Sequence, residues 1–285
     1  MNECKIAIIY FSATHVTKTY TEIIKNSLVE LGKEVKLFNI TSFSSRQNSL
    51  PTDEFESFIF GFPVFSDFIP SVIDTWLPTN KGLGKRCVFF LTYGARTTGY
   101  AHFHTKSLLE QAGFKVMFAA EFLGRHSFNV GGWRILPDRP NESDFSVARE
   151  FAALAVKHFS LSEESEFTLQ KPFGYDRTLE FIKTQSNKIE RAWTHPIRIS
   201  SECCMCGNCV TECPNQAFDA ETGLSDPIKC IECMHCVTIC PDQVIKVDER
   251  MKTAYTKFLQ YWHLTDEIME SRKSRIITKA WHTNF

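Results

Sequence analysis

The cysteines between residues 203 and 240 constrain this chain more than any other feature. Nine of its 11 cysteines lie there, and only Cys4 and Cys87 lie elsewhere. Eight of the nine form two copies of the spacing C-x2-C-x2-C-x3-C, each followed by proline, and the copies are 27 residues apart. They are Cys203, Cys206, Cys209 and Cys213, then Cys230, Cys233, Cys236 and Cys240. A disulfide framework would spread its cysteines through a small secreted domain, so this clustering indicates metal binding.

The duplicated segment, about residues 199–248, resembles bacterial-type ferredoxin. That resemblance implies two [4Fe–4S] clusters and one-electron transfer, with the fourth cysteine of each copy binding the cluster of the other copy. Cluster one is then expected to bind Cys203, Cys206, Cys209 and Cys240. Cluster two is expected to bind Cys230, Cys233, Cys236 and Cys213.

Cys204 has no place in this repeat, because using it instead of Cys203 would break the spacing. We expect it to be a free thiol beside cluster one. A pair of zinc sites is the alternative for the whole segment, since zinc also takes four cysteine ligands, often mixed with histidine. A duplicated all-cysteine spacing with proline after each fourth cysteine favours iron–sulfur clusters.

Short apolar runs alternate with amphipathic segments over the first 160 residues. Strands are expected at 5–11, 34–40, 58–64, 86–93 and 115–122, and helices at 16–32, from about 70, at 101–112 and at 144–159. This alternation predicts βαβ units and a parallel sheet. The expected units are an α/β domain, a linker, the cysteine domain and a helical tail, at 1–160, 161–198, 199–248 and 249–285. The linker is expected to contain a helix near residues 178–192.

The loop SATHVT, residues 12–17, joins the first expected strand to the first helix. Its hydroxyls, together with the N–H groups at a helix N-terminus, can hold a phosphate group. Taken alone, such a loop can equally be a plain helix cap. The loop contains no glycine, the residue on which phosphate-binding loops usually depend.

This loop resembles the phosphate loop of flavodoxins, in which Ser12, Thr14 and Thr17 match the three hydroxyl positions. Ala13 and His15 stand where that family usually has glycine. The departure at His15 is the more serious, because its imidazole could either donate to the phosphate or block the site. Two later stretches, FGFPVF (60–65) and TYGARTTGY (92–100), resemble the loops that flank the flavin ring in that family.

The whole pattern resembles a flavodoxin–ferredoxin fusion, often called a ferrodoxin, up to about residue 248. The resemblance implies a flavodoxin-like, doubly wound, five-stranded parallel sheet of order 2-1-3-4-5, followed by a small α+β ferredoxin domain with two [4Fe–4S] clusters. It also implies FMN at the carboxyl ends of the strands. The implied FMN-binding residues are Ser12, Ala13, Thr14, His15, Val16, Thr17, Phe62, Pro63, Val64, Phe65, Thr92, Tyr93, Gly94, Arg96, Gly99 and Tyr100.

Three functions fit these features. The first is an electron-transfer protein that passes electrons between FMN, the two clusters and a partner oxidoreductase. The second is an FMN-dependent reductase of a small molecule, fed by the clusters. The third is a ferredoxin whose flavodoxin-like domain holds no flavin and serves for docking. The chain lacks the G-x-G-x-x-G fingerprint of a nicotinamide site, so a redox partner protein is expected instead of NAD(P)H.

The charge balance limits the other partners. A net charge of −1 gives no reason to expect nucleic acid, and no apolar run approaches the length of a membrane span. The N-terminal MNECKIAIIYF is not typical of a signal peptide, so we expect a cytoplasmic protein. The cysteine segment has eight acidic residues against two lysines, while the tail is basic. These two charges could dock internally or form separate solvated faces.

Overall fold

A computed structural model describes residues 5–161, 167–184 and 192–278 of the chain. Five parallel strands form its centre in the order β2-β1-β3-β4-β5, as predicted. They are β1 (Lys5–Tyr10), β2 (Glu34–Asn39), β3 (Ser57–Pro63), β4 (Arg86–Tyr93) and β5 (Lys115–Leu123). This order is the flavodoxin-like, doubly wound one, in which ligands bind where the strand order reverses, beside β1 and β3.

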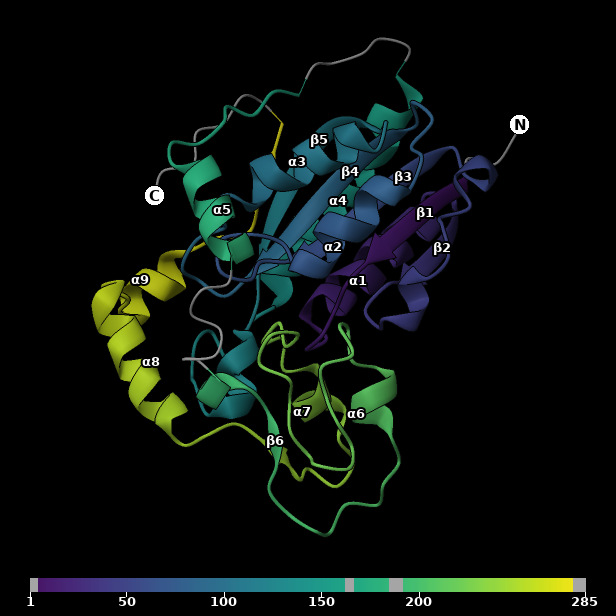
Figure 1. Cartoon of the computed structure of the whole chain (residues 1–285). Helices are drawn as coiled ribbons and strands as arrows, with labels where there is room; N and C mark the ends of the chain where they lie inside the picture. Colours follow the sequence, from purple (N-terminus) through teal and green to yellow (C-terminus); the bar gives the residue numbers. More distant parts are fainter. Residues whose placement is uncertain (1–4, 162–166, 185–191, 279–285) are drawn as a thin grey trace.

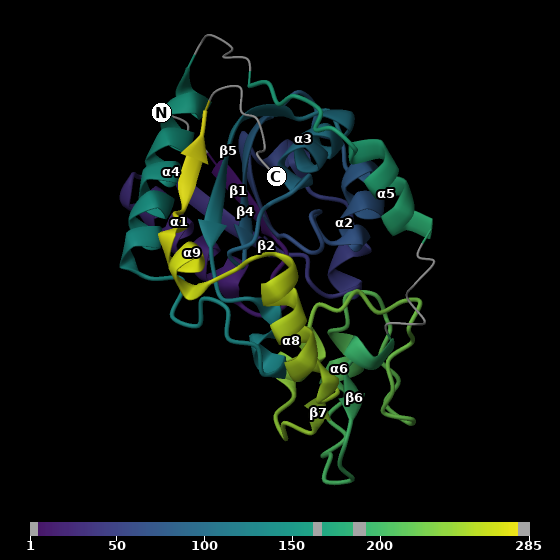
Figure 2. The ribbon, with the colours of Figure 1, turned by 90° about the vertical axis from the view of Figure 1, so that its left-hand side faces the viewer.

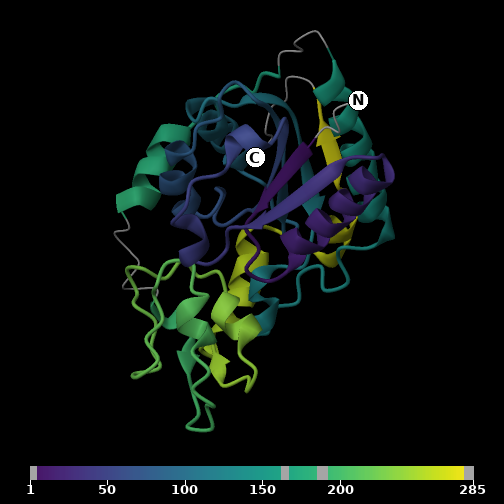
Figure 3. The ribbon, with the colours of Figure 1, turned by 90° about the vertical axis from the view of Figure 1, so that its right-hand side faces the viewer.

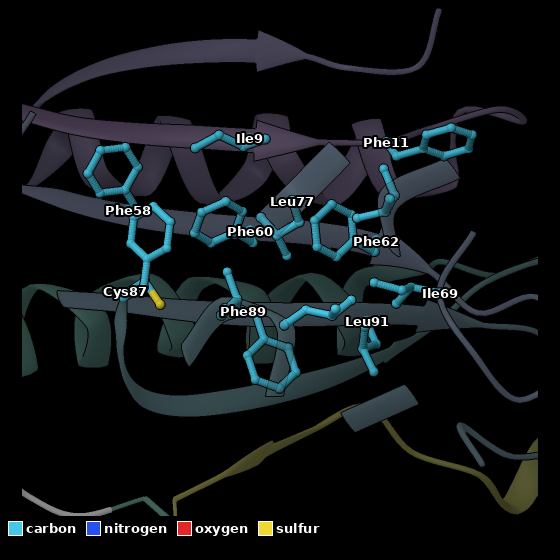
Figure 4. Packing of buried hydrophobic residues seen from close by; sticks show 14 of the residues in the cluster. Ile9, Phe11, Phe58, Phe60, Phe62, Ile69, Leu77, Cys87, Phe89 and Leu91 are labelled. Carbon is cyan, nitrogen blue, oxygen red and sulfur yellow. The ribbon is translucent and has the colours of Figure 1, made fainter. Parts of the chain in front are cut away.

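Helices cover both faces of the sheet (Figure 1). One face packs against α1 (Val16–Glu30) and α4 (Glu142–Ser160), and the other packs against α2 (Ser71–Trp76) and α3 (Ala101–Gln111). The central strands are apolar on both faces because both are buried. Figure 4 shows the α2 and α3 side, where Phe58, Phe60 and Phe62 of β3 follow one another toward the carboxyl end of the sheet.

The C-terminal tail adds a sixth strand that the sequence reading missed. The tail contains the helices α8 (Arg250–Tyr261) and α9 (Asp266–Ser271), and then β8 (Arg275–Ile277) pairs antiparallel with β5 (Figure 2). Three residues are too few to show a strand period in the sequence. The strand is held by tertiary contacts instead, among them Arg275 Nε, which donates to Glu121 Oε1 at 2.7 Å.

The linker helix α5 (Tyr175–Thr184) begins earlier than expected, and residues 185–191 of the expected helix lie outside the described residues. His104 of α3 ties α5 to α2, since its ring nitrogens lie 2.7 Å from Tyr175 Oη and 2.8 Å from Asp74 Oδ1. Both bonds are shielded from water, so they fix the linker against the helical layer.

The cysteine-rich unit is small and lies at the carboxyl ends of the parallel strands (Figures 1 and 3). It contains β6 (Ile197–Arg198) paired antiparallel with β7 (Ile245–Lys246), and the short helices α6 (Asn208–Thr211) and α7 (His235–Ile239). The remaining helical turns are the 3-10 segments Ser44–Arg46, Thr52–Glu54, Leu77–Thr79, Ser127–Gly131 and Ala192–Thr194. Within the described ranges, none of the helices has the length and apolar character needed to cross a bilayer.

Candidate cofactor sites

The cysteines of the repeat converge in two groups. A small cavity is lined by four of them, Cys213, Cys230, Cys233 and Cys236. These are the four expected for cluster two, and Cys213 reaches the cavity from the first copy of the repeat. Ala217 N–H also donates to Cys213 Sγ at 3.2 Å, the kind of backbone contact that tunes an iron–sulfur site.

The other group contains Cys203, Cys206, Cys209 and Cys240. Burial raises the pKa of Cys209, and its three group members raise it further because like charges disfavour ionisation. Cys204 lies exposed beside them, where its N–H donates to Asp242 Oδ2 at 2.7 Å. A hydrogen bond between the Cys204 thiol and Asp242 raises the Cys204 pKa to about 11, and this thiol is not among the three that influence Cys209. Among the described residues, no three His, Cys, Asp or Glu side chains are spaced to hold a single metal ion.

The internal repeat is preserved in the backbone as well as in the cysteines. Three pairs of residues 27 positions apart have φ between 50° and 76°: Met205 and Glu232, Gly207 and Met234, and Gln216 and Gln243. Five of these six are not glycine, and non-glycine residues rarely adopt this conformation. The matched turns wrap both halves of the segment in the same way, which explains how identical spacing yields two similar cysteine groups.

The loop of residues 12–17 has a left-handed turn at His15, where the flavodoxin resemblance leads us to expect glycine. His15 has φ 69° and ψ −10°, the left-handed conformation for which glycine is usual. The chain therefore keeps the glycine-like turn while replacing the residue. Ser12 Oγ accepts a hydrogen bond from Lys18 N–H at 3.0 Å, which fixes the loop against the first turn of α1.

Basic side chains lie near this loop. Burial lowers the pKa of His15, and the nearby basic groups of His235, Lys18 and Arg125 lower it further. The cationic side chains of Lys18 and Arg125, together with the N-terminus of α1, create a field that favours a phosphate group. Ala13 and Val16 are buried at the loop, and Thr14 is half-buried.

Thr17 has a second partner inside the protein. Its hydroxyl is buried and lies 2.8 Å from the hydroxyl of Thr92 at the end of β4. The Thr17 hydroxyl is thus shared with the strand, so it connects the loop of residues 12–17 to the carboxyl end of β4. Tyr93, the next residue, is buried, and burial raises its pKa.

The two loops expected to flank a flavin ring contact each other. Arg96 forms an ion pair with Asp67, and Tyr100 N–H donates to Asp67 O at 2.8 Å. Gly99 permits this approach, because a Cβ there would lie 2.4 Å from the Cβ of Asp67. Val64 N–H donates to Thr92 O at 2.9 Å, so the loops also meet at their bases.

The other predicted flavin residues divide between core and surface. Phe62 is fully buried among the residues of the sheet core, whereas Pro63, Val64 and Phe65 are half-buried at its end. Gly94 lies against the His126 side chain. The Arg96 guanidinium lies 4.2 Å from the ring centre of Trp262, at the end of α8.

The tail helix covers the loop that follows β5, a contact that sequence reasoning did not find. Trp133 stacks beside His126 and packs against Phe258 of α8, while its Nε1–H donates to Met251 O at 2.9 Å. Arg46 and His235 were missed as well, although both are buried where the two domains meet. The helical spacing of the tail aromatics was visible in the sequence, but the surface they cover was not.

His126 gives this region a predictable pH dependence. Burial lowers its pKa to about 4, and its Nδ1 accepts a hydrogen bond from Phe128 N–H at 3.1 Å, a bond that protonation would break. The unfolded chain binds a proton at this histidine near its ordinary pKa of 6.5, so unfolding takes up nearly one proton between pH 4 and 6.5. Stability should therefore fall as the pH is lowered through this window.

The measurement is urea unfolding at several pH values. His126→Phe keeps an aromatic ring beside Trp133 and should reduce the number of protons taken up on unfolding by nearly one. His263→Asn, at an exposed position, should leave that number unchanged. If the free energy of unfolding changes with pH at the same slope in His126→Phe and in the wild type, this assignment is refuted.

Comparisons with known proteins found one family model and a set of solved structures that are similar to parts of the chain. Residues 195–253 match the family model described as a 4Fe-4S dicluster domain. No curated protein matches the chain. Among solved structures, an archaeal flavodoxin is 17% identical, with a TM-score of 0.41, and covers 55% of this chain and 99% of its own. Flavodoxin 1 from Bacillus cereus is 15% identical, with a TM-score of 0.42, and covers 54% of this chain and 98% of its own.

The strand order and the matched segment define the class of this protein. It joins a flavodoxin-like α/β domain to a 4Fe-4S dicluster domain. A doubly wound α/β domain followed by a 4Fe-4S dicluster segment is the architecture that the sequence resemblance predicted.

Proposed function

We propose that the protein is an electron carrier that passes electrons between FMN, two [4Fe–4S] clusters and a partner oxidoreductase. FMN supplies two-electron chemistry in one-electron steps, and a [4Fe–4S] cluster exchanges single electrons. One chain holding both would connect a two-electron partner to a one-electron partner. In this proposal the polypeptide holds the flavin site and the cluster sites close together and excludes water between them.

The observation that supports this most directly is the contact between the cluster-two cysteines and the phosphate loop. His235, the residue before Cys236, donates its Nδ1–H to Ala13 O at 2.7 Å. A carbonyl can only accept, so the proton of this histidine lies on Nδ1. The bond is buried and joins two segments that are 222 residues apart in the sequence.

Apolar packing brings the same two sites together. Cys233 belongs to the buried cluster that also contains Phe11, Ala13 and Phe62, and Phe65 and Ile231 pack against that cluster. These side chains exclude water between the cysteine cavity and the carboxyl end of the sheet. Cys206 of the other group is exposed. We therefore place cluster two next to the flavin and cluster one on the side that a partner can reach.

The experiment is to count cofactors after anaerobic purification. Acid extraction should release one FMN per chain, and iron and sulfide should each be about eight per chain, as two cubanes require. Thr14→Val, which removes a loop hydroxyl but little volume, should lower FMN retention and leave iron at about eight. The matched control Thr79→Val, after α2, should retain both. Iron well below eight in the wild-type protein would contradict the proposal.

A second candidate, a two-cluster ferredoxin with a flavin-free docking domain, is favoured by one observation. The loops expected to flank the ring contact each other through Arg96 and Asp67. Under this alternative the same extraction yields eight irons and no FMN, and Thr14→Val changes nothing.

A further inference from the structure

The guanidinium of Arg46 is buried at the boundary between the two domains. It lies in the turn after β2, in the flavodoxin-like domain, and only 9% of its surface is exposed. Its Nη1 donates to Ile40 O, Thr41 O and Ser42 O at 2.7, 2.9 and 3.0 Å. Its Nη2 donates to Pro214 O, next to Cys213.

All four of these acceptors are neutral carbonyl oxygens. They satisfy the donors of the guanidinium but leave its positive charge to be balanced by other groups. Burial lowers the Arg46 pKa to about 10, and the thiolates of Cys213 and Cys233 act in the opposite direction. The side chain is therefore cationic at neutral pH, and it is bonded to Pro214, which lines the cluster-two cavity together with the four cysteines.

A fixed positive charge at Arg46 should change the reduction potential of a cluster bound in this cavity in one direction. Reduction of a [4Fe–4S] cluster adds one negative charge, so a nearby cation stabilises the reduced form and raises the reduction potential. The effect is strong because the group is buried, where the dielectric is low and salt screens little. Pro214, whose carbonyl accepts from Arg46, lines the cavity of the cluster-two cysteines, so the effect is larger on that cluster.

We propose that Arg46 is a positioning and charge-setting residue of the flavodoxin-like domain that raises the reduction potential of cluster two above that of cluster one. This inference rests on the proposed function, because it needs a cluster bound by Cys213, Cys230, Cys233 and Cys236. Its consequence is that a single electron on the iron–sulfur unit resides mainly on the cluster that faces the flavin site. The docking of one domain on the other thus determines how the two clusters share electrons.

The test is a potentiometric titration of the anaerobic holoprotein followed by electron paramagnetic resonance. Arg46→Gln should shift electron sharing toward cluster one by about tenfold or more, and tenfold corresponds to 59 mV for one electron. Measuring the same change in a Cys206→Ala background, where only cluster two keeps its four cysteines, assigns the shift to cluster two. Arg86→Gln is the matched control, because Arg86 also donates to backbone carbonyls but lies where β4 begins.

Two further variants separate charge from folding. Arg46→Lys keeps the charge, so one electron should be distributed between the two clusters nearly as in the wild type. Arg46→Met removes the charge and should behave like Arg46→Gln. The inference is overturned if Arg46→Gln and Arg86→Gln give the same cluster-two potential, or if Arg46→Lys shifts it as far as Arg46→Met does. Either result with about eight irons per chain leaves the proposed function intact, whereas wild-type protein without the irons refutes the function itself.

Discussion

Replacing Cys213 with alanine is expected to remove cluster two and to leave cluster one in place. Cys213 belongs to the first copy of the repeat, yet it lines the same cavity as Cys230, Cys233 and Cys236 of the second copy. A cubane needs four ligands, so the loss of one thiolate should take iron from about eight to about four per chain. Cys240→Ala should cause an equal loss from cluster one.

Pairs of substitutions test which cysteines share a cluster. If Cys213 and Cys233 serve the same cluster, the double variant Cys213→Ala with Cys233→Ala should keep about four irons, like either single variant. Cys213→Ala with Cys206→Ala should lose both clusters. Ligation within each copy predicts the reverse, namely that the second pair keeps four irons and the first pair loses all eight.

Cys204→Ala is the control for this series. The thiol is exposed, its backbone is held by Asp242, and it stands outside both groups. Iron and sulfide should therefore stay at about eight. Loss of iron in this variant would mean that Cys204, and not Cys203, is a ligand of cluster one.

The sequence predicted those parts of the fold that have a local period or spacing. All five parallel strands follow from apolar runs, and β4 was placed at its observed bounds, Arg86–Tyr93. The cysteine groups follow from the repeat because ligand spacing is itself a geometric constraint. In both cases, residues close together in the sequence contain the information.

Arg46, His235 and β8 could not be found in this way, because their roles depend on contacts far along the chain. The turn around Arg46 reads as a polar loop, and only the docked ferredoxin unit brings Pro214 to its guanidinium. His235 stands between two ligands and looks like a spacer until Ala13 is placed against it. At His15 the residue type suggested an obstacle, but the backbone there has the conformation of the glycine it replaces.

Replacing Asp144 with alanine is expected to cause the largest loss of stability in the flavodoxin-like domain. The carboxylate is 1% exposed, forms a two-pronged ion pair with Arg139, and accepts from Asn141 N–H at 3.0 Å. It also accepts from Ser274 Oγ at 2.6 Å, and that hydroxyl accepts from Leu123 N–H at 2.9 Å. One side chain therefore connects the start of α4, the end of β5 and the segment that leads into β8.

Removing it leaves the Arg139 guanidinium without its carboxylate in a largely buried place, which costs about 3–5 kcal/mol. The free energy of unfolding, measured anaerobically by urea titration followed by tryptophan fluorescence, should fall by that amount. Asp144→Asn keeps one acceptor oxygen, for either Asn141 N–H or Ser274 Oγ, and loses the charge, so its loss should be intermediate. Glu142 lies in the same first turn of α4 as Asp144 and forms an exposed ion pair with Arg149. Glu142→Gln breaks this pair and should change the free energy of unfolding by less than about 1 kcal/mol. If Asp144→Ala and Glu142→Gln unfold at the same urea concentration, the buried network does not hold the tail to the sheet, and β8 is retained by its pairing with β5 and by the contact between Arg275 and Glu121.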